Sequence, residues 1–529
     1  MIPRRIVDRV SATDTSRVYL AACFSLLCLL PLLILRDYTP ANELKYLSIA
    51  DEAIRNHHWF VMTNHGIPYT DKPPFYFWII MVSKLLFGRH ILGILSFFSI
   101  FPALITAFIM DHWCKPYLDG NSRVTAILLL LTTGYYAGAS VVLRMDMLMT
   151  MFIVGAIYCF YCLYSKVGKK NKYQWAFAIC ILMAIYSKGF MGFLVPLVSS
   201  IVFLLSKKQI KSIGQYWGWR TCLILILGMG WWFAMVAYEG GAAYLYSLTV
   251  GQSLNRSFMH APHEHPFYYY LVYMTYTIAP WTLFYVITFC KAFKFKNNDL
   301  VRLFLIVIGS TFIMLSCFKC KLEIYLLPII PFICYLSFIV FQKIKKNFVL
   351  WSSVFLFPMG LLVFTVPFYL WTMHNNSIPV RSGWMLLAAL IISLFTLYGV
   401  YQIFYYRRLL LGVRYLCVGL FLGLFFGGFS LLQINPYIGY HHSAKVALLL
   451  QDKWDTKGIC TFNMKSSENM DAFTGCSVQK VESDEIDKKE NKNKILIIPD
   501  TEYNDKTLQV GLRNRCCRFK ALNYWYVRL

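Results

Sequence analysis

The chain has 529 residues, of which 58% are hydrophobic and only 15% are charged, and its formal net charge is +25. A soluble protein of this length cannot bury so large an apolar fraction, so the composition excludes a soluble fold and predicts a membrane protein with many spans. The positive charge does not indicate a nucleic-acid partner, because most Lys and Arg residues lie in short loops between apolar segments, where they set membrane topology.

Apolar segments recur along the chain at about the 20 residues that a helix needs to cross a bilayer. The first follows a basic N-terminus without a small-residue cleavage site, so we expect an uncleaved first helix. Helices are predicted because they satisfy their own backbone hydrogen bonds in lipid. The predicted spans lie near residues 18–35, 92–111, 124–142, 147–165, 174–187, 190–206, 221–238, 268–290, 301–317, 325–342, 349–371, 384–404 and 413–433.

The segment 75–88 is apolar but short, and Lys84 interrupts it, so it is either a further span or a helix in the membrane interface. The distribution of basic residues favours the interface. With thirteen spans, the short loops on the N-terminal side hold twenty basic residues. The opposite side, beyond residue 90 and without the tail, holds six, namely Arg144, Lys188, Arg256, Lys319, Lys321 and Arg381. The positive-inside rule then predicts a cytoplasmic N-terminus and an extracytoplasmic C-terminus.

The tail after the last span, residues 434–529, is more polar and contains short strand-like runs such as KILIIPD at 494–500. We expect a small extracytoplasmic α/β domain there. The predicted fold class is therefore an all-α polytopic membrane protein with about 13 helices in residues 1–433, followed by this soluble domain.

The first outer loop, residues 36–91, is the first long polar interruption of the chain. It carries several of the carboxylates that lie outside the tail. Such a loop between hydrophobic segments is more often a working surface than a connector. Its charged residues of interest are Asp37, Glu43, Asp51, Glu52, Asp71 and Lys72.

Further charged and polar residues lie at the tips between spans on the same predicted side. These tips are too short to carry a charge far from the bilayer, and ionisable groups at that depth are costly unless they meet partners or water. We therefore expect one polar cavity near the outer leaflet. The residues at these tips are Arg144, Asp146, Lys188, Arg256, His260, His263, Glu264, His265, Lys319, Lys321, Glu323 and Tyr325.

Each of these residues also has a structural interpretation. Arg144 and Asp146 form an ion pair between helices in that interpretation, and Lys188 extends to the lipid headgroups. Asp71 and Lys72 are then a surface pair of little energetic value, and Tyr325 belongs to the aromatic belt. The functional interpretation depends on convergence, because all these sites share one side of the membrane.

The residue types fit phosphate chemistry. The basic side chains Lys72, Arg144, Lys188 and Lys321 suit a phosphate or diphosphate. Glu43, Asp71 and Asp146 suit a general base or a metal ligand, and Asp71 with His263 or His265 offers oxygen and nitrogen ligands for a divalent ion such as Zn²⁺. A lipid-borne phosphate matches a basic cavity at headgroup depth.

The motifs resemble those of the GT-C membrane glycosyltransferases, specifically the superfamily of aminoarabinose transferases and protein O-mannosyltransferases. The match follows the family order over residues 17 to about 433. Its elements are NELKY at 42–46, YTDKPP at 69–74, Asp146, SKG at 187–189, HEHPFYYY at 263–270 and KLEIYLLP at 321–328.

The resemblance implies an enzyme of the plasma (inner) membrane that transfers a sugar on the extracytoplasmic side. The donor would be a polyprenyl-phosphate sugar, either aminoarabinose-like or another pentose or hexose, and the acceptor lipid A or another envelope glycan. Lys72 and Tyr325 would hold the donor phosphate, with Arg144, Lys188, Arg256 and Lys321 as further substrate contacts. Asp71 and His263, with His265 beside them, would hold any divalent metal (Zn, Mg or Mn).

One departure from the family pattern concerns the base. The usual catalytic aspartate falls on Asn42, which cannot take a proton. Glu43 is the adjacent carboxylate and our first choice, with Asp37 and Asp146 as alternatives. A phosphate acceptor that is already ionised would need little help from a base.

Two rival functions remain. A protein O-mannosyltransferase belongs to the same superfamily, but a hydroxyl acceptor needs a base more than a phosphate does. A transporter or flippase would place charges along a route through the bilayer, often within paired repeats, and neither feature is visible. The sequence does not identify the sugar, the acceptor, the metal or the oligomeric state.

Overall fold

The computed structural model describes residues 4–249, 264–374, 381–486, 488–503 and 517–529. The chain divides into two compact units. The helical unit contains residues 1–33, 70–76 and 93–427, and the loop–tail unit contains residues 34–69, 77–92 and 428–529.

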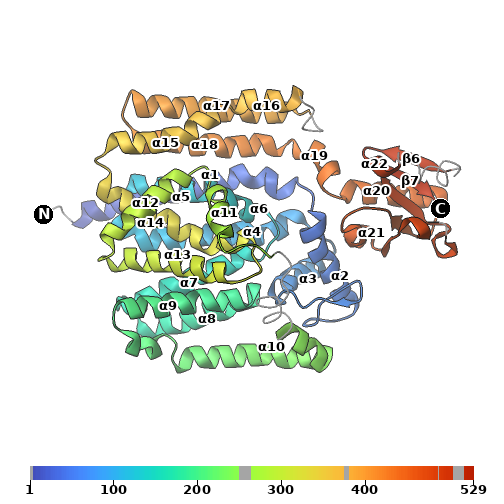
Figure 1. Ribbon diagram of the computed structural model, residues 1–529, viewed down its shortest axis with the longest axis horizontal. Coiled ribbons are helices and arrows are strands. Elements are labelled where there is room, and N and C mark those ends of the chain that lie inside the picture. Colours follow the sequence, from blue (N-terminus) through green and yellow to red (C-terminus); the bar gives the residue numbers. More distant parts are fainter. Residues whose placement is uncertain (1–3, 250–263, 375–380, 487, 504–516) are drawn as a thin grey trace. The chain divides into compact units, whose positions relative to one another are not determined.

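The helical unit is a bundle of apolar helices (Figure 1). Within it α7, α8 and α9 lie side by side, and α15 packs against α17. The helices are α1 (Arg4–Ile34), α4 (Leu92–Cys114), α5 (Gly120–Thr132), α6 (Gly134–Val141), α7 (Asp146–Tyr164), α8 (Lys170–Lys188), α9 (Phe190–Ser206), α10 (Trp219–Tyr246), α11 (Tyr269–Thr277), α12 (Thr282–Ala292), α13 (Asp299–Cys317), α14 (Ile330–Ile344), α15 (Phe348–Val363), α16 (Thr365–His374), α17 (Gly383–Phe404) and α18 (Leu409–Gly428). Short helical turns connect them at η2 (Lys115–Tyr117), η3 (Ile210–Gln215), η5 (Phe293–Phe295) and η6 (Glu323–Ile329).

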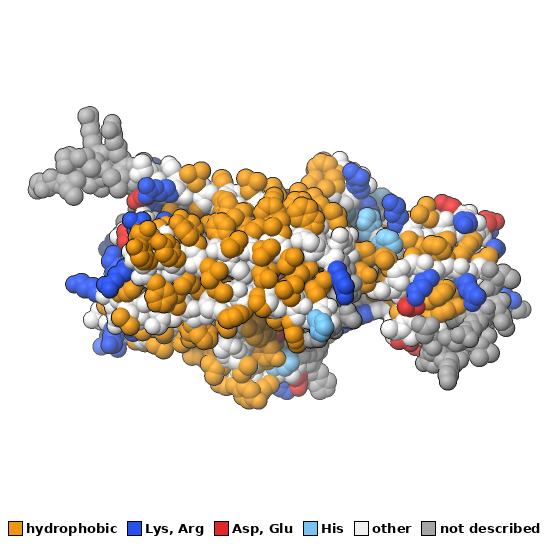
Figure 2. Space-filling model, turned by 90° about the horizontal axis from the view of Figure 1, so that it is seen from above, with side chains coloured by type: hydrophobic (Ala, Val, Ile, Leu, Met, Phe, Trp, Pro, Cys, Tyr) orange, Lys and Arg blue, Asp and Glu red, His pale blue; other side chains and the backbone are white. Residues whose placement is uncertain are grey.

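Many of these helices are long and apolar enough to cross a membrane. Over the described ranges there are nine, and ten if the bent pair α5 and α6 forms one span. Hydrophobic side chains cover much of the surface of the helical unit in Figure 2. Large exposed residues of this unit include Leu227 and Leu394. An exposed apolar surface of this extent belongs in lipid, so the polytopic membrane fold predicted from composition is confirmed.

The helix α3 (Phe75–Phe87) has 13 residues, about 20 Å at 1.5 Å per residue, which is too short to cross a hydrocarbon core of about 30 Å. Its second half exposes Val82, Leu85, Leu86 and Phe87. A short helix with exposed apolar residues and a lysine, Lys84, suits the membrane interface.

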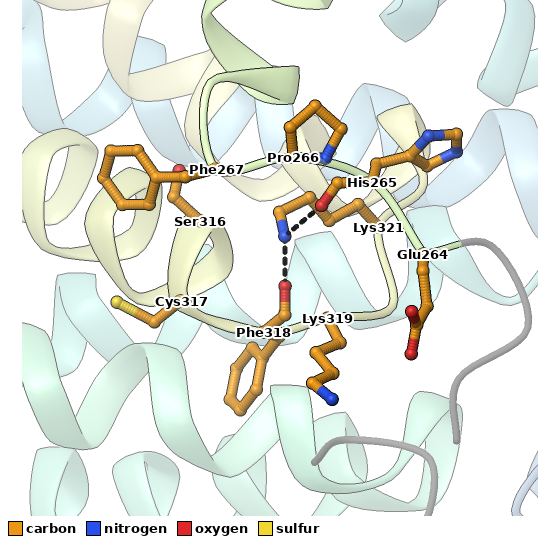
Figure 3. A pocket seen from close by; sticks show the side chains of 9 residues that line it. All are labelled: Glu264, His265, Pro266, Phe267, Ser316, Cys317, Phe318, Lys319 and Lys321. Atoms are coloured by element: carbon orange, nitrogen blue, oxygen red, sulfur yellow. Dashed lines mark hydrogen bonds between the residues drawn. The ribbon is translucent and has the colours of Figure 1, made fainter. Parts of the chain in front are cut away.

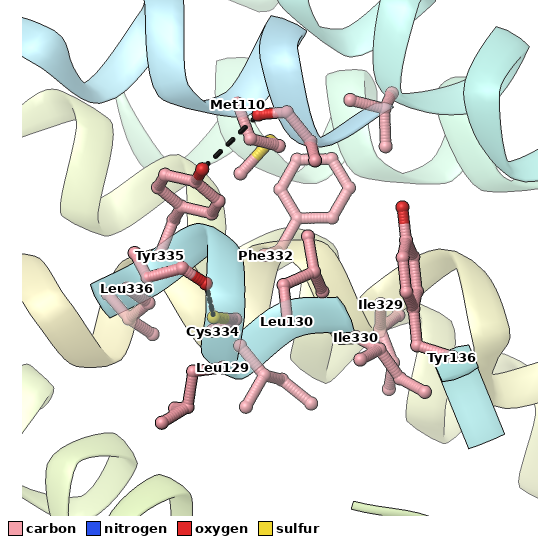
Figure 4. Close-up of a cluster of buried hydrophobic side chains, with 14 of the residues drawn as sticks. Met110, Leu129, Leu130, Tyr136, Ile329, Ile330, Phe332, Cys334, Tyr335 and Leu336 are labelled. Carbon is pink, nitrogen blue, oxygen red and sulfur yellow. Dashed lines mark hydrogen bonds between the residues drawn. The ribbon is translucent and has the colours of Figure 1, made fainter. Parts of the chain in front are cut away.

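The core of the helical unit is a continuous cluster of buried apolar residues. Figure 4 shows the part where Leu129 and Leu130 of α5 meet Phe332 and Leu336 of α14. The hydroxyl of Tyr335 donates to the carbonyl of Ala107 in α4 at 3.2 Å. Such polar atoms are satisfied on the neighbouring helix, which keeps α4, α5 and α14 in one register.

The loop–tail unit joins most of the first outer loop to the C-terminal tail. The carboxylate of Asp37 accepts hydrogen bonds from the backbone amides of Tyr38 and His441, at 2.7 and 2.9 Å. Asp471 lies 3.8 Å from Arg55 and 4.0 Å from His65. The loop elements are η1 (Pro40–Leu44), α2 (Lys45–Arg55), β1 (Thr63–Asn64), β2 (Ile67–Pro68) and most of α3.

The tail itself folds as a small α/β region, which consists of one sheet and several short helices. Its five-stranded sheet has the order β4-β3-β5-β7-β6, in which β4, β3 and β5 are parallel and β7 and β6 are antiparallel to their neighbours. Strand β5 is almost fully buried because it lies inside the sheet. The elements are α19 (Leu431–Ile438), α20 (His441–Trp454), β3 (Ile459–Thr461), η7 (Ser467–Met470), α21 (Asp471–Thr474), β4 (Val478–Lys480), η8 (Ser483–Glu485), η9 (Lys489–Asn491), β5 (Ile495–Pro499), α22 (Asp500–Tyr503), β6 (Arg518–Ala521) and β7 (Tyr524–Arg528).

Candidate active site

A cavity of about 630 Å³ in the helical unit gathers several of the residues singled out from the sequence. Asp71, Lys72, Lys188 and Tyr325 all line it, although they come from three separate parts of the chain. Its wall is completed by Thr70, Pro73, Ile185, Gly189, Phe190, Met191, Phe193, Leu225, Met229, Trp232, Phe233, Leu248, Thr249, Leu315, Phe318 and Cys320.

The cavity has a polar part and an apolar part. The polar part comes from residues 70–73, from Lys188 at the end of α8 and from Tyr325 in η6. The apolar part comes from α9 and α10, through side chains such as Phe193 and Trp232. This apolar side was not predicted from the sequence. A hydrophobic residue in a predicted span can face a cavity or the lipid, and the sequence pattern is the same in both cases.

Asp146 supports the polar part of the cavity through its contact with Lys188. It begins α7, where the helix dipole favours a negative charge, and it is only 2% exposed. Its carboxylate pairs with the ammonium of Lys188 and lies 3.3 Å from Nε of Arg144. The predicted interaction of Arg144 with Asp146 is therefore present, but neither residue lines the cavity. Asp146 instead fixes the direction of Lys188.

Lys188 and Tyr325 contact each other directly. The ammonium of Lys188 lies 4.6 Å from the centre of the Tyr325 ring, within the range of a cation–π interaction. Lys188 is the last residue of α8, and Gly189 follows with φ 79° and ψ −144°, which only glycine adopts readily. This turn lets α9 begin at once and leaves the lysine at the cavity wall.

Lys72 reaches the same place from the first outer loop. Its charge acts on both Asp146 and Lys188. The two prolines that follow, Pro73 and Pro74, are buried and restrict the backbone. Two ammonium groups and a phenol hydroxyl thus share one cavity wall, an arrangement that suits a phosphate.

Lys321 and His265 lie elsewhere in the helical unit. They line a second pocket of about 450 Å³, which Figure 3 shows. The buried ammonium of Lys321 donates to the backbone carbonyl of His265 at 2.9 Å and to that of Phe318. The ring of His265 stacks on Tyr269 at 4.2 Å. The structure therefore does not place His265 in the cavity that Asp71 lines.

Glu43 and Asn42 belong to the loop–tail unit, where they occupy the single turn η1. Glu43 is fully buried, and its carboxylate accepts hydrogen bonds from Arg36 at 2.5 and 2.6 Å and from the amide and hydroxyl of Thr39 at 2.8 and 2.9 Å. Asn42, the neighbouring residue, is exposed. Both oxygens of Glu43 thus have partners inside its own loop.

The other loop carboxylates hold the loop–tail unit together. Asp51 pairs with Lys84 at 2.5 Å and with His90 at 2.7 Å. Burial alone would raise the pKa of Glu52, but hydrogen bonds from the Thr63 hydroxyl and from the amides of Gly66 and His65 outweigh it and lower the pKa. These two carboxylates have structural partners.

The predicted metal ligands do not converge within the described structure. No group of three or more His, Cys, Asp and Glu side chains there is arranged to hold a metal ion. His263 lies outside the described residues, as do Arg256 and His260. The metal remains a prediction that depends on residues around Asp71 and His263.

Three kinds of comparison link this geometry to known proteins. The family model described as dolichyl-phosphate-mannose-protein mannosyltransferase matches residues 71–232. Among curated proteins, the undecaprenyl phosphate-alpha-4-amino-4-deoxy-L-arabinose arabinosyl transferase of Shewanella sediminis is 26% identical over 323 residues, which is 60% of this chain and 58% of that protein. The transferase of the same name from Yersinia enterocolitica is 25% identical over 321 residues, 58% of this chain and 56% of that protein. The matched part of the chain thus spans less than two thirds of these relatives.

Solved structures agree on the fold over a longer stretch. The crystal structure of ArnT from Cupriavidus metallidurans bound to undecaprenyl phosphate has a TM-score of 0.76 at 14% identity and covers 97% of this chain and 98% of that one. An oligosaccharyltransferase from Archaeoglobus fulgidus has a TM-score of 0.51 at 11% identity, with 88% and 63% covered. In sequence, this chain is thus similar to a mannosyltransferase family model and to aminoarabinose transferases, and it shares the fold of the Cupriavidus metallidurans enzyme.

Proposed function

We propose that the chain is an inverting glycosyltransferase that takes a sugar from a polyprenyl-phosphate donor. The observation that carries this proposal is the two-part cavity. Lys72, Lys188 and Tyr325 supply charge and a hydroxyl for a phosphate, and the apolar wall from α9 and α10 suits a prenyl chain. A lipid-linked phosphate has these same two parts.

The residues of the cavity would act on the leaving group. The acceptor oxygen forms a bond to the anomeric carbon of the sugar while the bond from that carbon to the phosphate oxygen breaks. The polyprenyl phosphate leaves with the bonding electrons, and Lys72 and Lys188 stabilise the added negative charge. Asp146 takes part by holding Lys188 in place, so it is a positioning residue.

We propose lipid A, or another envelope glycan, as the acceptor, and an undecaprenyl-phosphate sugar, which the names of the curated relatives contain, as the donor. The base is open between two carboxylates. Asp71 lines the cavity, whereas Glu43 has both oxygens engaged by Arg36 and Thr39. Asp71 is therefore our first choice, and a phosphate acceptor that is already ionised would need neither.

We also propose thirteen spans in an inner membrane, with the N-terminus in the cytoplasm and the cavity outside. Nine of the spans correspond to helices of the described residues that are long and apolar enough by themselves, and a tenth corresponds to the bent pair α5 and α6. The other three are α8, which begins with two lysines, the 17-residue α9, and the pair α11 and α12. The excess of basic residues in the short loops on the N-terminal side supports this orientation.

A protein O-mannosyltransferase is the second candidate, because the matching family model carries that description. It would use the same donor cavity with a hydroxyl acceptor. A hydroxyl has to lose its proton during transfer, so this candidate requires a working base.

Mass spectrometry of envelope lipids and glycoproteins tests the proposal in cells that lack the protein and are complemented with variants. Wild type should restore a sugar-sized mass on lipid A, and Lys72→Met should not, at equal protein in the membrane. Lys170→Met, an exposed lysine at the start of α8, serves as the matched control and should behave as wild type.

The pattern of products separates the remaining alternatives. A mass restored on glycoproteins alone would favour the mannosyltransferase. Loss of transfer in Asp71→Asn but not in Glu43→Gln would support Asp71 as the base, and the reverse would support Glu43. Full transfer by Lys72→Met would overturn the donor site.

A further inference from the structure

We propose that the pocket around Lys321 is a second anion site, which holds a phosphate monoester on the headgroup of a lipid acceptor. This inference rests on the proposed function, because it assigns the acceptor side of the same reaction. The pocket lies in the helical unit and is lined by Glu264, His265, Pro266, Phe267, Ser316, Cys317, Phe318, Lys319 and Lys321 (Figure 3).

Lys321 is a buried cation without a counter-ion in the described structure. It is 3% exposed, and its ammonium donates to two backbone carbonyls, those of His265 and Phe318. Among the described residues, the ionisable groups whose charge acts on it are Cys317 and Cys320, and no carboxylate is among them. An ammonium has three N–H donors, so one remains after these two hydrogen bonds. A buried charge of this kind is costly unless an anion offsets it.

Ser316 supplies an independent sign of a ligand. Its side chain is 3% exposed, and its hydroxyl has no hydrogen-bond partner in the described structure. Buried hydroxyls are normally paired, because leaving one unpaired costs about 1–3 kcal/mol. Ser316 and Lys321 line the same pocket, so a single anion can use both donors.

The rest of the pocket adds a second positive charge and an exposed aromatic residue at one side. Lys319 is exposed at the rim, and Figure 3 shows its ammonium and the carboxylate of Glu264 at the side of the pocket away from Ser316. Two lysines against one glutamate leave a net positive charge, which suits a doubly charged phosphate monoester. Phe267 at the other side is 66% exposed, and exposed aromatic residues are typical of the membrane interface.

The pocket also adjoins the donor cavity. Phe318 lines both this pocket and the donor cavity, so the two share a wall. An acceptor held by its phosphate at Lys321 would lie next to a donor held at Lys72 and Lys188. Burial also lowers the pKa of Lys321, and a bound anion would oppose that effect.

Native mass spectrometry of the full-length protein in detergent tests the site with phosphatidic acid as the phosphate-monoester probe. We expect wild type to bind it more tightly than phosphatidylglycerol, a phosphodiester. Lys321→Met should weaken binding roughly tenfold to hundredfold, the effect of one hydrogen bond to a charged group, and Ser316→Ala about threefold to tenfold. Ser316→Ala keeps the two carbonyl contacts of Lys321, so it remains informative if Lys321→Met does not fold.

Two further variants make the outcome unambiguous. Lys72→Met should lose undecaprenyl phosphate but keep phosphatidic acid, and Lys170→Met should keep both. Unchanged phosphatidic acid binding in Ser316→Ala and Lys321→Met would overturn the second site, as would equal binding of phosphatidylglycerol, which marks a bulk lipid contact. Unchanged undecaprenyl phosphate binding in Lys72→Met would instead count against the proposed function alone.

Discussion

At the scale of single residues, Asp146 and Lys188 combine a structural role with a proposed role in donor binding. They form a buried ion pair between the first residue of α7 and the last residue of α8, and only Lys188 lines the cavity. The ion-pair interpretation of Asp146 thus agrees with its contacts to Arg144 and Lys188. Lys188 does not simply extend to the lipid headgroups, because it lines the cavity. Variants of Asp146 and Lys188 can therefore separate effects on protein stability from effects on the binding of polyprenyl phosphate.

Asp146→Asn should destabilise the protein more than the double change of Asp146 and Lys188. Asp146→Asn leaves the buried ammonium of Lys188 without its carboxylate, at a cost of about 3–5 kcal/mol. Lys188→Met should cost less, because Asp146 still lies 3.3 Å from Nε of Arg144. The double variant should recover part of that loss but not the binding of polyprenyl phosphate, because Lys188 is still absent. Thermal unfolding in detergent measures the first effect and native mass spectrometry the second.

The pair of exposed Arg17 and partly buried Asp14, 3.6 Å apart, provides the control. Arg17→Ala should cost less than about 1 kcal/mol, as exposed pairs do. A double variant no more stable than Asp146→Asn would argue against the ion pair of Asp146 and Lys188. A double variant that retains the donor lipid would argue against the cavity.

Glu52 makes a pH-dependent contribution to the loop–tail unit. Its pKa in the folded protein lies below its ordinary value of about 4.5, because hydrogen bonds to its carboxylate outweigh burial. A lowered carboxyl pKa gives stability that is fully present above the ordinary value and is lost as the pH falls through the folded value. Protection of the His65 and Gly66 amides from hydrogen exchange, corrected for intrinsic rates, should therefore fall below about pH 4.5.

Glu52→Gln gives the matched control, because the amide has nearly the same shape and no charge in this range. The variant should show weaker protection at neutral pH and little further change on acidification. Protection in wild type that is constant down to about pH 3 would contradict the role of the charged carboxylate.

At the scale of elements, the turn between α8 and α9 has the strictest local requirement near the cavity. Gly189 adopts φ 79° and ψ −144°, a region that costs other residues about 1–3 kcal/mol. Gly189→Ala should lower the thermal midpoint and weaken donor binding, since the turn positions Lys188. Gly138 of α6 has open space around its Cα, so Gly138→Ala should be neutral or stabilising. Equal effects of the two changes would contradict this account.

The membrane helices were largely predictable from sequence, since a run of apolar residues has few alternatives in lipid. Each predicted span coincides with a helix or a pair of helices. Breaks such as the 67° bend between α5 and α6 were not predicted. Of the cavity residues, Lys188 was predictable because a charge at a short tip is conspicuous. Lys72 was predictable as a charged residue of the first outer loop, and the resemblance to the family motifs singled out Lys72 and Tyr325. The buried hydroxyl of Ser316, which has no hydrogen-bond partner among the described residues, and the apolar wall of the cavity were not predictable, because both depend on packing.

At the scale of the whole molecule, chain order did not indicate the grouping of the first outer loop with the tail. The contacts that join them, such as Asp37 with the amide of His441, connect residues about four hundred positions apart. No local pattern marks such a contact. The sequence presented Glu43 as the first choice of base, and the structure shows its carboxylate buried and bonded to Arg36 and Thr39. These partners depend on how the loop folds, so the sequence did not predict them.

The most direct test of the central claim is an experimental structure of the full-length protein with undecaprenyl phosphate. The account predicts the phosphate within hydrogen-bond distance of Lys72 and Tyr325 and beside Lys188, with the prenyl chain along Phe193 and Trp232. A phosphate bound at any other place, with this cavity free of it, would contradict the account.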